Sequence, residues 1–348
     1  MKRFVLVLGL RIVQITIILY GIVPDALSQQ NLLSHYFSSS AVYNPALAGD
    51  TRFARILFNT RIQPSPQNVI KNSLLSADFK IPNHRSGLNL SLNRITSVFD
   101  ITSVKTSYSH AFALNSEIWI KGGLGLSVNS VNTHSLNYRF PDQYNDFGFT
   151  GQPTAEPQLN EKSVYTGLFS GMAVYAFQGW FTMAAEYLNF PQEMYAGQRN
   201  RVPFRVYMQA GYLFTIDKDK KAKRMFSRYG SIEPFSSLGP VLSFSTEGPF
   251  RYGNAGINGF FHPVFWGLTF RRSAWNGGLF SEGTSGIHIL GGYRREEFSI
   301  AYSFDFRLNS IPSAYRTAHE ISLIWYFYTI RDDYRKIKLS PFPNQLMY

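Results

Sequence analysis

The chain has 348 residues, of which 45% are hydrophobic and 16% aromatic, and its formal net charge is +12. This composition is too rich in apolar side chains for a disordered protein. The absence of cysteine excludes disulfide bonds, thiol nucleophiles, iron–sulfur clusters and cysteine zinc sites.

Residues 1–28 have the pattern of a cleaved signal peptide. Lys2 and Arg3 are followed by an apolar run over 4–23 and by small residues at 26–28, the spacing that a signal peptidase reads. A retained membrane anchor is the alternative interpretation. The remaining chain has no apolar run of about 18 residues, so a spanning helix is not expected there. An exported protein of this kind is either soluble or a β-barrel.

Residues 29–50 form a segment rich in Ser, Tyr and Asn without strand or helix periodicity. Asn44 precedes a proline, which favours an extended backbone, and Gly49 permits a turn. Taken alone, this segment is typical of a polar loop that leads into the first strand.

From Thr51 onward, apolar and polar residues alternate in fourteen strand-like segments, and almost nothing indicates a helix. The pattern is clearest over 286–328, where aromatic residues alternate with small and charged ones. The expected strands are 51–62, 70–81, 85–94, 100–114, 116–131, 163–177, 179–189, 202–216, 232–246, 249–261, 263–273, 284–294, 296–307 and 315–329.

The connections differ between the two ends of these strands. Links after the second, fourth, sixth, tenth and twelfth strands are very short, whereas those after the first, fifth, seventh, eleventh and thirteenth are longer. Two links break this rule, because 217–231 is long and basic and 246–249 is short. Tight turns at one end and long loops at the other are typical of outer-membrane barrels, in which the turns face the periplasm.

Charged residues fall on the strand face opposite to the aromatic one. On a barrel this face lines the lumen, where both signs pair or meet water, whereas facing lipid they would cost about 2–4 kcal/mol each. Arg61 and Lys105 share this face. The candidate lumenal charge network consists of Arg55, Asp78, Lys80, Glu117, Lys121, Glu186, Arg205, Arg271, Asp305, Arg307 and Glu320.

These patterns together predict an all-β fold, a transmembrane outer-membrane β-barrel of about 14 antiparallel strands over 51–329. It has short periplasmic turns and longer extracellular loops. A soluble β-sandwich that buries the aromatic face is the alternative. Residues 330–348 are expected to form a polar periplasmic C-terminal tail.

A barrel of this width has a lumen large enough to need filling. We therefore predict that part of 29–50 folds into or across the periplasmic mouth and closes the pore. A disordered periplasmic tail is the alternative for the same segment.

Several blocks resemble the PorP/SprF family of type IX secretion system outer-membrane proteins. Residues 43–49, Tyr-Asn-Pro-Ala-Leu-Ala-Gly, resemble its N-terminal signature, although the family commonly has an aromatic residue where this chain has Leu47. Residues 86–92 are similar to its third strand, and 268–273, 301–306 and 319–323 to its late strands and ending. The signature and candidate plug residues are Tyr43, Asn44, Pro45, Ala46 and Gly49.

The resemblance implies a non-enzymatic outer-membrane protein of the Bacteroidota that serves type IX secretion or the linked gliding machinery. Such proteins are thought to help large secreted surface proteins of the adhesin type to be secreted or anchored. They are also thought to contact periplasmic components of the machine. The tail beyond the barrel departs from the family pattern, so the resemblance leaves open whether this chain serves the secretion core or one particular client.

The link after the eighth strand carries a basic cluster. Its position predicts a periplasmic turn that docks an acidic partner or anionic lipid head groups, with a merely solvated turn as the alternative. Nucleic acid is a poor partner, because no stacking aromatics accompany the cluster on a sheet face. The docking residues are Lys218, Lys220, Lys221, Lys223 and Arg224.

Signatures of enzymes, cofactors and metal sites are absent from the sequence. One rival function is an outer-membrane hydrolase, which a serine and His110 within hydrogen-bond reach would support. The other is a transport barrel for small hydrophobic molecules. That function needs a continuous apolar path through the lumen, whereas the predicted inner face is charged.

Overall fold

The computed structural model describes the chain between Leu33 and Phe327. The gaps within this range are 36–38, 52–53, 65–68, 82–83, 98, 116–117, 134–140, 146–147, 153–161, 196–197, 217–235, 276–282, 296 and 309–316. The predicted signal peptide, Glu117, the basic segment 218–224 and the C-terminal tail therefore lie outside the described residues.

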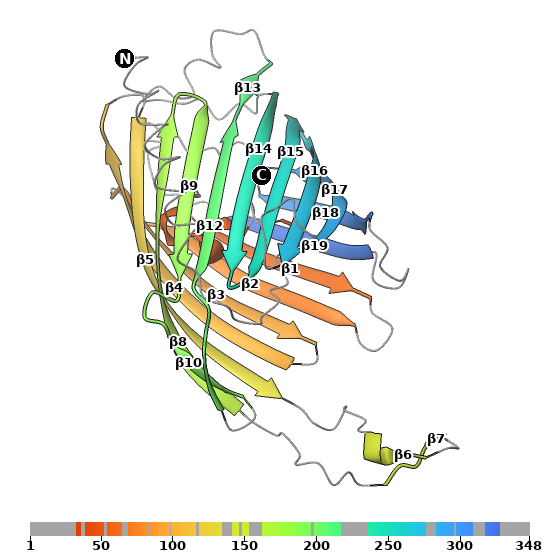
Figure 1. The fold of residues 1–348 in the computed structure, drawn as a ribbon. Helices are drawn as coiled ribbons and strands as arrows, with labels where there is room; N and C mark the ends of the chain where they lie inside the picture. Colours follow the sequence, from red (N-terminus) through yellow and green to blue (C-terminus); the bar gives the residue numbers. More distant parts are fainter. Residues whose placement is uncertain are drawn as a thin grey trace.

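Fourteen antiparallel strands form one closed ring, which confirms the predicted fold class (Figure 1). The first strand pairs with the last, and β12 pairs with both β9 and β14, so the sheet has no free edge. The strands are β1 (Ala54–Gln63), β2 (Ile70–Lys80), β3 (Ser86–Thr96), β4 (Phe99–Ala113), β5 (Ile118–Thr133), β8 (Lys162–Ala176), β9 (Gly179–Glu186), β12 (Arg205–Tyr212) with its continuation β13 (Phe214–Thr215), β14 (Ser237–Glu247), β15 (Phe250–Phe261), β16 (Val264–Trp275), β17 (Gly283–Arg294), β18 (Phe298–Arg307) and β19 (Thr317–Phe327).

One barrel strand and several short elements in the loops differ from the strands that the sequence predicts. The expected strand 202–216 begins only at Arg205, after Pro203, and is interrupted at Leu213, whose backbone N–H donates to the carbonyl of Gln178. The long loops carry a turn and two hairpins, which are too short to show a sequence period. These elements are η3 (Pro141–Gln143), β6 (Tyr144–Asn145) with β7 (Gly148–Phe149), and β10 (Gln192–Tyr195) with β11 (Gln198–Arg201).

The two faces of the ring follow the alternation in the sequence. On β5, Leu124 and Leu126 are 68% and 55% exposed. Ser127 and Asn129, on the opposite face of the same strand, are only 1% and 2% exposed. Apolar side chains thus face outward and polar ones inward, the arrangement of a barrel in lipid. No helix among the described residues is long and apolar enough to cross a membrane.

The lumen is filled differently at its two ends. At the end where the short turns connect the strands, large side chains pack inward, with Trp180 over Gly211 and Phe265 over Gly292. Ala46 and Leu47 of the N-terminal segment join this cluster. The opposite half, toward the long loops, carries most of the charged groups described below.

Candidate functional site: the N-terminal segment in the barrel lumen

Residues 33–35 and 39–51, here called the lumenal segment, lie inside the ring of strands (Figure 1). The segment contains the helical turn α2 (Ser40–Tyr43) and the 3-10 turn η1 (Pro45–Leu47). Between them, Asn44 is extended, as expected before a proline, and its side chain accepts a hydrogen bond from the Ala46 N–H at 3.0 Å. Local sequence therefore determines this double turn.

Three barrel glycines make room for the lumenal segment. A Cβ atom on Gly123 would lie 2.3 Å from the Ala46 nitrogen, and one on Gly87 would lie 2.4 Å from the Ala48 oxygen. On Gly171 it would lie 2.0 Å from the Asn44 side-chain oxygen. These contacts explain glycines that would otherwise weaken the strands.

Lumenal side chains also bond the backbone of the segment. The Ala48 carbonyl accepts hydrogen bonds from the Ser109 hydroxyl at 2.7 Å and the Lys121 ammonium at 2.9 Å. The Asn44 amide donates to the carbonyls of Met172 and Met183, both at 3.3 Å. Buried backbone groups that lie outside regular structure are in this way hydrogen-bonded.

Buried ion pairs surround the segment and include many of the predicted lumenal residues. Lys121 pairs with Asp50 of the lumenal segment at 3.5 Å. The strand pattern did not indicate this aspartate. The Lys105 ammonium also donates to the Val42 carbonyl at 3.4 Å. The pairs between strands are Arg55 with Asp78 at 2.7 Å, Lys105 with Glu186 at 2.5 Å, and Arg205 with Glu247.

Glu320 forms the most extensive contact between barrel and segment. Its carboxylate is fully buried and accepts hydrogen bonds from the backbone N–H groups of Ser34 at 2.6 Å and His35 at 2.8 Å. Asn59 donates to it at 2.8 Å, and Arg61 lies 3.4 Å away. Hydrogen bonds from this many donors offset the free-energy cost of burying the carboxylate.

The start of the lumenal segment adds further groups to this cluster. The Ser34 hydroxyl donates to Asp305 at 2.7 Å, and Asp305 also pairs with Arg61 and, at 3.4 Å, with Arg271. Burial lowers the pKa of the His35 imidazole despite the opposing effect of the Glu320 carboxylate. These contacts lie at the loop ends of the strands, so the segment reaches deeper than the predicted periplasmic mouth.

The remaining predicted residues are also placed by the structure. Tyr43, Asn44, Pro45, Ala46 and Gly49 all belong to the lumenal segment, and the Gly49 backbone has a φ of 63°. Lys80 lies half-buried on the inner face, and Arg307 donates to the Gln63 side chain at 3.2 Å.

The sequence carries a signal for the contact between the barrel wall and the lumenal segment. Leu57, Leu74 and Ile324 are apolar residues on the polar face of their strands. In the structure they are at most 3% exposed and pack with Leu33 and Val42 of the lumenal segment. An apolar residue on a lumenal face indicates an internal partner.

On the outer face near the turns, Ser86 and His110 lie within hydrogen-bond reach. The Ser86 hydroxyl is 2.8 Å from His110 Nδ1 and 2.9 Å from the Tyr108 hydroxyl. Ser86 is only 6% exposed, and the His110 ring packs edge-on against Phe112. The pair predicted for a hydrolase is present, but Tyr108 competes for the same serine hydroxyl.

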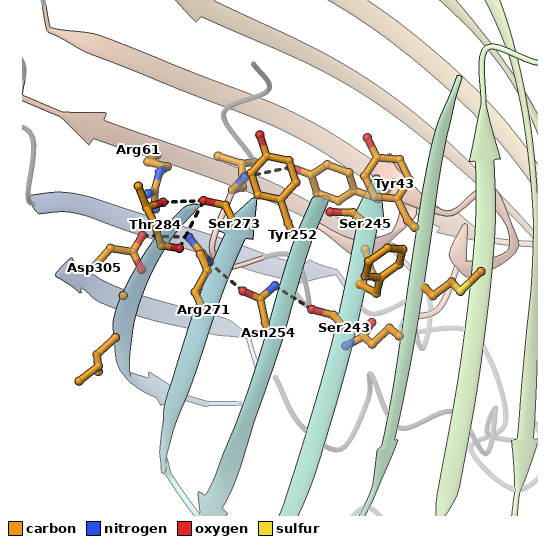
Figure 2. Close-up of a pocket in the computed structure, with 18 of the residues that line it drawn as sticks. Tyr43, Arg61, Ser243, Ser245, Tyr252, Asn254, Arg271, Ser273, Thr284 and Asp305 are labelled. Carbon is orange, nitrogen blue, oxygen red and sulfur yellow. Dashed lines mark hydrogen bonds and ion pairs between the residues drawn. The ribbon is translucent and has the colours of Figure 1, made fainter. Parts of the chain in front are cut away.

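A cavity remains between the lumenal segment and the wall formed by β12 and β14–β18, with a volume of about 150 Å³. Its lining combines apolar side chains with charged ones, among them Arg61, Arg271 and Arg307. In Figure 2, one end of the cavity holds Arg271, Asp305 and Thr284, and Tyr43 of the lumenal segment lies toward the other end.

A closed antiparallel ring with an apolar exterior and a charged, filled interior defines an integral β-barrel protein of the outer membrane. Over residues 26–325 the sequence matches the family described as type IX secretion system membrane protein PorP/SprF. The chain belongs to this family, as the resemblance of its N-terminal signature predicted.

Several solved outer-membrane barrels are similar to this chain at low sequence identity. The toluene transporter TbuX of Ralstonia pickettii is 7% identical with a TM-score of 0.48, over 83% of this chain and 94% of that one. The toluene transporter TodX of P. putida is 9% identical with a TM-score of 0.46, over 83% and 94%. The Acinetobacter baumannii outer membrane protein Omp33 is 9% identical with a TM-score of 0.40, over 80% and 100%. A search of curated proteins gives no match.

Proposed function

We propose that this protein is a non-enzymatic accessory component of type IX secretion whose own N-terminal segment closes its lumen. It assists the secretion or surface anchoring of large client proteins, which associate with its surface rather than pass through it. The observation that carries the proposal is the seating of Ser34 and His35 on buried Glu320, together with Ala48 on Ser109 and Lys121.

The space left in the lumen and the strength of the contacts with the segment both support this function. A fourteen-stranded ring occupied by a folded segment leaves no passage for a large polypeptide. Charged groups buried in the lumen are hydrogen-bonded to the segment, and releasing it would leave them unpaired at a cost of about 1–3 kcal/mol per group or more. A permanently seated plug fits an anchor or docking platform better than a conduit.

The proposed partners lie on both sides of the membrane. The basic residues Lys218, Lys220, Lys221, Lys223 and Arg224 follow β13 in the link at the turn end, the periplasmic end in barrels of this class. We propose that they dock an acidic surface of a periplasmic secretion component, after the signal peptide 1–28 has been removed.

Cross-linking in cells tests this assignment. A photoreactive residue at Lys221 is expected to capture a periplasmic secretion component, and deletion of the gene is expected to abolish surface display of at least one large client. A photoreactive residue at Leu124 on the lipid-facing side serves as the control and should capture none. Normal surface display without the protein would contradict the proposed role.

A hydrolase acting on lipid is the second candidate, favoured by the 2.8 Å contact between Ser86 and His110. A serine nucleophile needs a base within this distance. Against it, the serine is buried and its hydroxyl also hydrogen-bonds the Tyr108 hydroxyl. The transport of small hydrophobic molecules is supported less, because the charged side chains of Arg61, Arg271, Asp305 and Arg307 line the cavity and interrupt an apolar path.

Replacing Ser86 with alanine decides between packing and catalysis. We expect the purified protein in phospholipid vesicles to release no fatty acid above the background given by the Ser86→Ala variant. Loss of the two hydroxyl contacts should lower stability by about 1 kcal/mol. Fatty-acid release that disappears in both Ser86→Ala and His110→Ala, while Tyr108→Phe keeps it, would establish the hydrolase instead.

A further inference from the structure

We propose that the lumenal cavity binds a small ligand that carries a carboxylate or phosphate group together with hydroxyl groups, such as a sugar acid or a sugar phosphate. The cavity lies between the lumenal segment and the wall formed by β12 and β14–β18 (Figure 2). Its volume of about 150 Å³ corresponds to roughly five water molecules, which is the space of a small ligand rather than of a single ion.

Two arginines face the cavity with a glycine between them. Strand register places Arg271 of β16 opposite Gly286 of β17, and Gly286 opposite Arg307 of β18. All three residues line the cavity. Because Gly286 has no side chain, there is open space between the side chains of Arg271 and Arg307. The backbones of these two arginines are about 10 Å apart, twice the spacing of neighbouring strands. An anionic group placed in this gap contacts both arginines.

The charges around the cavity do not balance. Arg61 is paired with Glu320 and Asp305, and Arg271 lies 3.4 Å from Asp305. Arg307 makes no ion pair with any residue in the described part of the chain, and its hydrogen bond there is the one to Gln63 at 3.2 Å. A guanidinium has five N–H donors, so Arg307 keeps most of its donors for a ligand. An uncompensated charge inside a protein favours an anionic partner.

The other cavity walls supply groups that match hydroxyls. Ser243 accepts from the Asn254 amide at 2.8 Å, and the hydroxyls of Ser273 and Thr284 lie 2.5 Å apart. The buried Gln209 side-chain nitrogen also lines the cavity and has no hydrogen-bond partner among the described residues. Hydroxyl and amide groups both donate and accept, so they recognise hydroxyls, while arginine binds carboxylate and phosphate through paired N–H groups.

Calorimetric titration of the purified full barrel in detergent tests this site without any secretion partner, so its outcome is independent of the proposed function. The probes are galacturonate, glucose 6-phosphate and neutral glucose. We expect at least one of the two anionic sugars to bind, glucose to bind at least about tenfold more weakly, and Arg307→Gln to weaken the anion by about tenfold or more. Arg307→Lys should restore part of the affinity, because it keeps the charge.

The matched control is Arg94→Gln on β3, outside the cavity, where the arginine side chain is 63% exposed. It should leave the affinity unchanged. If Arg307→Gln fails to fold, protection of Arg307 from phenylglyoxal by the anionic sugar, followed by mass spectrometry of the wild-type protein, replaces it. Absence of binding by both anionic sugars, equal binding of glucose, or unchanged affinity without Arg307 would overturn the proposal.

Discussion

Replacing Gly123 with valine is expected to turn a barrel that conducts little current into an open channel. The new Cβ would lie 2.3 Å from both the Ala46 nitrogen and the Pro45 carbonyl carbon, and both are backbone atoms that cannot rotate away. The η1 turn therefore cannot seat, and the contacts of Ala48 with Ser109 and Lys121 are lost with it. The strand itself tolerates valine well.

Planar-bilayer recordings measure the effect against a matched neighbour. A Cβ on Gly122, one residue earlier on β5, has nothing within 4 Å, so Gly122→Val should conduct as the wild type does. A variant lacking residues 31–49 gives the conductance of the unplugged barrel, which Gly123→Val should approach. Equal conductance in the wild type and the deletion variant would show that the segment does not close the pore.

Replacing Glu320 with alanine is expected to lower the free energy of unfolding by about 3–5 kcal/mol, the range for removing one partner of a buried ion pair. The substitution leaves the N–H groups of Ser34 and His35 without an acceptor and leaves Arg61 with Asp305 alone. Glu320→Gln should have a smaller effect, because its amide oxygen still accepts a hydrogen bond.

Denaturant unfolding in detergent measures the stability, and cysteine labelling reports the position of the segment. The natural chain has no cysteine, so Ala41→Cys, at a site only 2% exposed, provides a single reporter thiol. Maleimide should label it slowly in the wild-type background and quickly with Glu320→Ala. Glu193→Ala, in the loop hairpin, is the control for loss of a carboxylate. Slow labelling in both backgrounds would mean that Glu320 does not hold the segment.

Much of the fold was predictable because its signal is local. Side chains on a strand alternate between faces whatever the distant partners are, so Ile56 and Phe58 already indicated an outer face, and Arg55 and Asn59 an inner one. The ring of fourteen strands followed from counting these segments. Hairpins such as β10–β11 were missed, because four residues are too few to establish a period.

The candidate site was predictable only in part. The alternation of side chains along each strand was enough to place Asp78, Glu186 and Asp305 on the inner face. The double turn at Asn44 and Pro45 also has a local cause. Which charges pair depends instead on strand register around the whole ring. Lys105 and Glu186, for example, are 81 residues apart in the chain and 2.5 Å apart in space.

The sequence by itself determined that this chain forms a membrane barrel with an apolar and a charged face. Its matching blocks determined its family. Both conclusions depend only on patterns within short segments of the chain. Only the tertiary structure decided where the N-terminal segment lies. Ser34 meets Glu320 across 286 residues of chain, and Gly123 faces Ala46 only once the ring has closed. Contacts of this kind depend on the spacing and register of many strands at once, and no local pattern encodes them.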